Sequence, residues 1–170
     1  QSLLANCSLL NVVNFGTRPD TSNVNNMSQM FQNCSTLTDL DVSMLRTTKV
    51  TSMTSMFENC SALKEIWIDP EGIDQGSDNF NSSNVTNMQR MFAGCTSIED
   101  LNVGKVETLK VTNMSSMFEG CASLAILNLS QFATMNVTDM SNMFAGCSSM
   151  DTFDLTAFQG NTLKLSLIHI

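Results

Sequence analysis

The stretch VTNMSSMFEGC, residues 111–121, sets the fold of this chain because it recurs along it. The pattern Val-x-x-Met-x-x-Met-Phe-x-x-Cys occurs five times in 170 residues, beginning at Val24, Val50, Val85, Val111 and Val137. A shortened copy, Leu3-Leu4-Ala5-Asn6-Cys7, opens the chain, and the six cysteines stand 27, 26, 35, 26 and 26 residues apart. The same residue type at one phase of a period near 26 indicates stacked repeats, each of which buries an equivalent residue.

The apolar residues of this stretch favour a short helix. They fall at positions i, i+3, i+6, i+7 and i+10, on one helical face. The polar residue after each Val is a candidate helix cap: Asn25, Thr51, Thr86, Thr112 and Thr138. Before each Cys stands Gly or Asn, which tolerate the left-handed conformation that ends a helix. A helix of about two turns is unstable alone, so neighbouring repeats must hold it.

A second pattern follows each cysteine and predicts a strand. It reads Leu-x-x-Leu-x-Leu, as in Leu124, Leu127 and Leu129. Its last two apolar positions alternate with polar residues, which is typical of a short strand with one buried face. With a period of 20–29 residues, this is the pattern of leucine-rich repeats. We therefore predict an α/β repeat solenoid, leucine-rich-repeat-like, with a parallel β-sheet on one face, short helices on the other and about 26 residues per repeat.

The repeats divide the chain into one array and a short tail. Residues 1–164 form a single solenoid array, with a partial repeat at 1–23 and repeats starting near 24, 50, 85, 111 and 137. The longest cysteine spacing contains DPEGIDQGSDNFNSS, residues 69–83, which we interpret as an insertion loop. Residues 165–170 resemble a translated sequencing adapter, and we interpret them, with the lone His169, as an assembly scar. The chain begins without Met inside a repeat, so we expect it to be a fragment.

Charge argues against two classes of partner. The chain carries 16 acidic and 8 basic residues, a net charge of −8 and a pI near 4.3. Nucleic-acid binding needs a basic surface, and anionic membranes attract basic segments. No apolar run reaches transmembrane length, so we expect no membrane insertion by this part of the chain.

Cysteine and methionine are candidate metal ligands, but their spacing favours packing. The methionines share the apolar stripe with phenylalanine, where they fill irregular gaps. A secreted chain with six cysteines could form disulfides, yet parallel stacked side chains rarely bring β-carbons close enough. We expect buried free thiols, no metal site and no cofactor. The insertion offers Asp69, Glu71, Asp74 and Asp78 to calcium, although without EF-hand spacing, and we favour a solvated acidic loop.

The outward positions of the strands form two rows. One row contains Asn14, Asp41, Trp67, Asn102, Asn128 and Asp154, and its neighbour contains Val12, Asp39, Glu65, Asp100, Ile126 and Thr152. Solenoids bind partners on such extended faces, and an exposed Trp is a good binding hot spot. The candidate partner-binding residues are Asp39, Asp41, Glu65, Trp67, Asp100, Asn102, Asn128 and Asp154. The alternative is an ordinary solvated sheet surface.

The repeat VTNMSSMFEGCASLAILNLSQF, residues 111–132, closely resembles the unit of BspA-like leucine-rich-repeat surface proteins of bacteria and some protists. The resemblance covers nearly all of residues 2–163. It implies an extracellular or cell-surface location and adhesion to proteins, either of the host matrix or of other microbial surfaces. It supplies no defined set of binding residues.

These observations predict a non-catalytic cell-surface module that adheres to or binds proteins through its strand face. A structural spacer or stalk within a larger surface protein is the alternative. A glycosidase would need two carboxylates flanking a cleft, for example Asp39 and Glu65. Because no pocket-forming pattern, nucleophile elbow or phosphate loop accompanies them, we expect no enzymatic activity.

Overall fold

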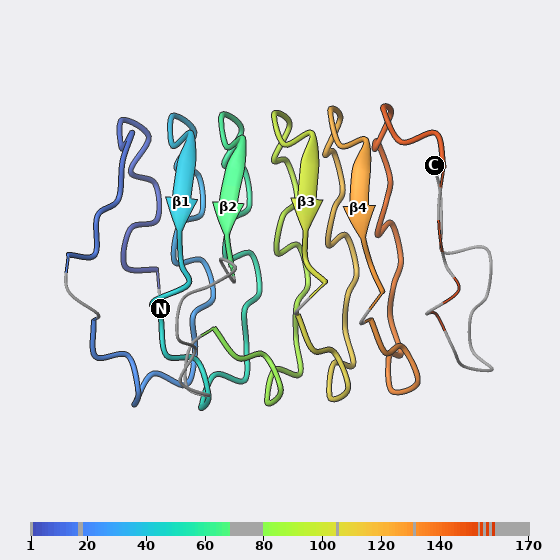
Figure 1. Cartoon of the computed structure of the whole chain (residues 1–170), viewed down its shortest axis with the longest axis horizontal. Helices are drawn as coiled ribbons and strands as arrows, with labels where there is room; N and C mark the ends of the chain where they lie inside the picture. Colours follow the sequence, from blue (N-terminus) through green and yellow to red (C-terminus); the bar gives the residue numbers. More distant parts are fainter. Residues whose placement is uncertain are drawn as a thin grey trace.

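The repeats stack side by side along the longest axis of the molecule (Figure 1). The computed structural model describes residues 2–16, 19–68, 80–104, 106–130, 132–152, 154, 156 and 158. Its strands are β1 (Asp39–Asp41), β2 (Glu65–Trp67), β3 (Asp100–Asn102) and β4 (Ile126–Asn128). β1 pairs with β2 and β3 pairs with β4, both in parallel. Parallel strands are therefore confirmed in the four repeats that begin near 24, 50, 85 and 111, although they form two separate pairs and not one continuous sheet.

The predicted helices are wrong. The segments concerned, residues 24–34, 50–60, 85–95, 111–121 and 137–147, are here called the Met-Phe segments. Across the described ranges the structure contains no helix, and these segments consist of successive turns. Alternate N–H groups donate to the next repeat, as Met27 N does to Ser52 O (3.0 Å) and Phe31 N to Met56 O (2.9 Å). The N–H groups between them donate to the carbonyl three residues earlier and so close turns, as Met30 N does to Met27 O (3.3 Å).

Left-handed residues explain why these turns do not wind into a helix. The residue before each Cys has positive φ, as predicted: 61° at Asn33, 60° at Asn59 and 73° at Gly120. A second left-handed residue recurs between the two methionines, for example Gln29 (φ 61°) and Ser116 (φ 57°). Two reversals of handedness within each segment exclude a right-handed helix, which requires negative φ throughout. They turn alternate N–H groups toward the neighbouring repeat.

The candidate helix caps act differently from the prediction. Each Thr hydroxyl donates to a carbonyl of the preceding repeat, as Thr51 Oγ1 does to Asn25 O (3.2 Å) and Thr138 Oγ1 to Thr112 O (3.0 Å). The backbone N–H of Thr51 reaches the same Asn25 carbonyl. These threonines therefore link repeats rather than cap helices.

One apolar core runs through the stack. Val, Met, Phe and Cys of the Met-Phe segments pack against the inward residues of the strand side. Phe31, Phe57, Phe92, Phe118 and Phe144 form a ladder of stacked rings, with centroid separations of 5.7, 5.2, 5.8 and 5.7 Å. The repeating register thus places like side chains on like, which buries a face that no single repeat could bury.

The insertion leaves the Met-Phe side of the stack intact. The repeats before and after the insertion still form backbone hydrogen bonds there, as Phe57 N does to Met91 O (2.9 Å). Arg90 pairs with Glu58 (2.7 Å) and with Glu119 (2.8 Å), so one guanidinium links three repeats. The calcium candidates Asp69, Glu71, Asp74 and Asp78, and the tail with His169, lie outside the described residues.

Five of the six cysteines are buried free thiols, as predicted, whereas Cys7 is exposed. Each buried Sγ donates to a main-chain carbonyl in the preceding repeat, for example Cys60 to Phe31 O (3.1 Å) and Cys121 to Phe92 O (3.2 Å). Burial raises the pKa of Cys60 and of Cys121 to about 12, and that of Cys147 to about 11. Thiols so protonated and enclosed are poor nucleophiles.

Thiol labelling should therefore distinguish Cys7 from the rest. At pH 8 we expect a disulfide-exchange reagent to modify one thiol in the native protein and six in denaturant, because only Cys7 is exposed. The release of the chromophore counts the thiols. Cys7→Ser should abolish the native reaction, and rapid labelling of a second thiol in the native state would contradict the buried ladder.

Candidate binding surface on the strand face

All eight predicted partner-binding residues are exposed, and seven of them lie on the strands β1–β4, whereas Asp154 lies outside any strand of the described chain. In the first pair of strands Asp39 lies opposite Glu65, and Asp41 lies opposite Trp67. In the second pair Asp100 lies opposite Ile126, and Asn102 opposite Asn128. The two predicted rows are thus present within each pair. Their role in binding stays a prediction.

Most residues of the first row also have a structural task that the sequence analysis missed. Asp41, Asn102, Asn128 and Asp154 each accept, through Oδ1, the N–H of the residue two positions later, at 2.9–3.0 Å. This bond closes an Asx turn, which for Asp41, Asn102 and Asn128 lies where the strand ends. The hydrogen bonds from the Thr156 side chain and backbone lower the pKa of Asp154. These turns could have been predicted from the sequence pattern Asp/Asn-x-Ser/Thr/Gly, which occurs at each of the four positions.

Trp67 is the exception in this row. An indole has no oxygen with which to close such a turn, and the nine extra residues of the long repeat follow it closely in the sequence. Its side chain is 41% exposed. An aromatic ring of this size, left in solvent and without a turn to close, is the strongest sign of binding on this face.

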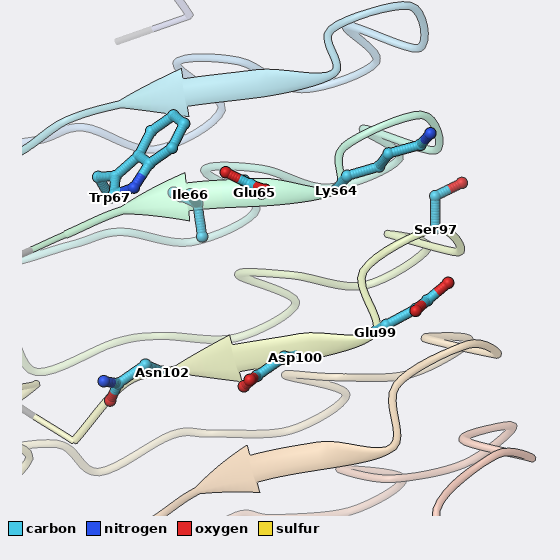
Figure 2. Close-up of a pocket in the computed structure, with 8 residues that line it drawn as sticks. All are labelled: Lys64, Glu65, Ile66, Trp67, Ser97, Glu99, Asp100 and Asn102. Atoms are coloured by element: carbon cyan, nitrogen blue, oxygen red, sulfur yellow. The ribbon is translucent and has the colours of Figure 1, made fainter.

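The sheet is interrupted beside Trp67. Within the described residues the strands form two separate pairs, and no ladder joins β2 to β3. A cleft of about 570 Å³ lies there. Figure 2 shows its two sides, with Lys64, Glu65, Ile66 and Trp67 on β2 or just before it, and Ser97, Glu99, Asp100 and Asn102 on β3 and the chain leading to it.

The central residues of the strands differ in burial, and Ile66 and Leu127 are only partly buried. Leu40 and Leu101, the central residues of β1 and β3, are each 1% exposed. Ile66, the central residue of β2, is only partly buried, and in Figure 2 its side chain points toward β3. An apolar floor is therefore accessible at the bottom of the cleft.

Four cleft residues were missed by the sequence analysis: Lys64, Ile66, Ser97 and Glu99. Lys64 and Glu99 each precede the first residue of a strand, one place before the rows that were considered. The irregular cysteine spacing of 35 was the signal that neighbouring strands would be separated here. Its consequence for the sheet could not be predicted without the backbone path.

The cleft is acidic. Glu65, Glu99 and Asp100 contribute carboxylates and Lys64 the single positive charge. No group of three or more potential metal ligands occurs in the part of the chain that the structure describes. Glu65 lines the cleft and Asp39 does not, so this pair of carboxylates does not flank a common cleft. The arrangement suits hydrogen-bond donors and cations.

Comparisons with known proteins found one family model and one solved structure that resemble the chain. The family model described as "Mycoplasma protein of unknown function, DUF285" matches residues 2–70 and 62–164. No curated protein matches significantly. A crystal structure of a leucine-rich cell surface protein from Faecalibacterium prausnitzii A2-165 is 18% identical, with a TM-score of 0.48, over 92% of this chain. The chain spans about a third (33%) of that structure.

In the described ranges the chain forms no helix with the length and apolar character needed to span a bilayer.

Proposed function

Because the chain belongs to the DUF285 family of Mycoplasma proteins of unknown function, to which no activity is assigned, we propose a function from its strand face. The chain is a non-catalytic, leucine-rich-repeat-like module that binds partner proteins there. We further propose that it acts outside the cell or at a cell surface, on host matrix proteins or on proteins of other microbes. The repeat's resemblance to BspA-like surface proteins supports this location.

The observation that carries the proposal is Trp67. It is 41% exposed and lies beside a cleft of about 570 Å³. Exposed carboxylates surround it, with Asp41 directly opposite on β1 and Glu65 on the same strand. An aromatic anchor among polar side chains is the usual composition of a protein-binding hot spot and its rim.

Trp67→Ala with Asp41→Asn is expected to weaken binding to a partner protein at least tenfold, because truncating a hot spot costs about 2 kcal/mol or more. Asparagine keeps the Oδ1 that accepts the Ser43 N–H, so the turn is preserved. Binding would be measured by biolayer interferometry against purified extracellular-matrix proteins and by adhesion of coated beads to microbial cells.

The matched control is Glu107→Gln with Leu109→Ala. It removes the same charge and one exposed apolar side chain, since Glu107 is exposed and Leu109 is 60% exposed. Neither residue lies on the strands. Equal affinity of the test variant and the control variant for a bound partner would refute binding through the strand face.

A structural spacer is the second candidate. It is favoured by the Asx turns, which give Asp41, Asn102, Asn128 and Asp154 a task in the fold without any partner. A spacer would bind nothing in these assays. It would also tolerate the removal of one whole repeat, residues 111–136, because each repeat contacts its neighbours in the same way.

A further inference from the structure

We propose that the cleft between β2 and β3 receives a lysine or arginine side chain from a basic segment of the partner protein. This inference rests on the proposed function, and it names the chemistry of the partner. It follows from the floor of the cleft, the charge of its rim and the backbone along its sides.

The floor suits the aliphatic stem of a long basic side chain. Ile66 is partly buried and lines the cleft, and its side chain points toward β3 (Figure 2). Trp67 lines the same cleft. Lysine and arginine bury their methylene groups on such apolar surface while the charged end stays polar.

The rim suits the charged end. Glu65, Glu99 and Asp100 are exposed and line the cleft. Among the described residues the ion pairs involve Arg46 and Arg90 only, so none of these three carboxylates is neutralised by a partner within the fold. A guanidinium or ammonium group could form charge-assisted hydrogen bonds here, which are the stronger kind.

The backbone along the cleft offers additional hydrogen bonds. In a parallel sheet, successive residues direct their N–H and C=O groups to opposite sides. Glu65 N donates to Thr38 O, toward β1, so the polar groups of Ile66 face β3. Glu99 O accepts from Ala125 N and Ile126 N, toward β4, so the groups of Asp100 face β2. Unpaired strand edges are groups that an extended peptide can bind.

The test uses the fluorescence of Trp67, the single Trp in a chain without Tyr. The full chain is titrated with the amidated peptide Gly-Arg-Gly-Arg-Gly, with Gly-Glu-Gly-Glu-Gly and with a neutral cello-oligosaccharide. We expect a saturable change with the arginine peptide alone. Its affinity should fall as salt is raised, because exposed charges are screened.

Glu99→Gln with Asp100→Asn should weaken binding of the arginine peptide at least tenfold and leave Trp67 in place. Glu107→Gln with Asp151→Asn is the matched control, since it removes the same two charges at exposed positions outside the cleft. It should change the affinity less than twofold. Circular dichroism and the unfolding temperature would verify that both variants fold.

Three results would overturn the inference. The first is an equal loss of affinity in the cleft variant and the control variant, which would indicate nonspecific attraction. The second is no fluorescence change with the arginine peptide. The third is a larger fluorescence change with the oligosaccharide that is the same in the wild type and in the cleft variant. The two proposals fail separately. If Trp67→Ala with Asp41→Asn abolishes partner binding and the cleft variant does not, the strand face binds but not through a basic side chain.

Discussion

Phe92→Ala is expected to lower the free energy of unfolding by about 4–6 kcal/mol, the largest effect of any single substitution considered. Phe92 is fully buried and stacks between two other rings, with centroids 5.2 Å from Phe57 and 5.8 Å from Phe118. Truncating a buried Phe costs about 3–5 kcal/mol, and losing the two ring contacts together adds about 1 kcal/mol.

The position of Phe92 makes this loss unusually damaging. It is the middle ring of the ladder, in the repeat that follows the insertion. The stability of a repeat array is approximately the sum of its repeats and their interfaces. One substitution here weakens two interfaces, including the one where β2 and β3 no longer pair.

Urea unfolding followed by circular dichroism would measure the change. Leu109→Ala is the control, because this apolar side chain is 60% exposed and should change the free energy of unfolding by less than about 0.5 kcal/mol. Similar losses in the two variants would show that the Phe ladder does not hold the repeats together.

Alkaline pH is expected to destabilise the chain steeply between about pH 9 and pH 12. An unfolded thiol ionises near its ordinary pKa of 9.0, whereas burial raises the pKa of Cys60 and of Cys121 to about 12. The folded state therefore retains protons that the unfolded state releases, and stability falls as pH rises above 9. At pH 10 each of these two thiols should cost about 1 kcal/mol.

Burial also raises the pKa of Cys95, the thiol between them in the ladder, and should steepen the loss. The chain has no tyrosine whose phenol could ionise in this range. The free energy of unfolding, measured from pH 7 to pH 10.5, gives the slope. The Cys121→Ala variant should be less stable than the wild type at pH 7. Between pH 7 and pH 10, its free energy of unfolding should then fall by about 1 kcal/mol less than that of the wild type. An unchanged slope in this variant would exclude the thiols as the cause.

The repeat period itself determined a large part of this structure. Parallel strands, their one-repeat register and the buried cysteines follow from spacing, because residues at one phase of a period must occupy equivalent environments in a stack. The left-handed residue before each Cys was also predictable, since Gly94, Gly120, Asn33 and Asn59 tolerate positive φ. The eight candidate binding residues are all exposed, as alternation alone predicted.

Tertiary structure alone decided the helices. The spacing of Val111, Met114, Met117 and Phe118 fits a helix, but it fits successive turns equally well, since both return a side chain to one face every three or four residues. The choice depends on where the N–H groups find acceptors. A neighbouring repeat supplies them at every second residue, as Ser52 O does for Met27 N, and a two-turn helix cannot compete with that ladder.

The cleft was likewise decided by tertiary structure. The extra residues after Ile68 were visible as a spacing of 35, but the sequence does not state which side of the stack they would open. The Met-Phe segments stay joined across the insertion by backbone bonds, by stacked Phe57 and Phe92 and by Arg90. The strands lack such ties, so the separation falls between β2 and β3. The sequence by itself therefore determines which residues occupy equivalent positions in the repeats. The hydrogen bonds between repeats determine the backbone conformation of each Met-Phe segment and the place where the sheet is interrupted.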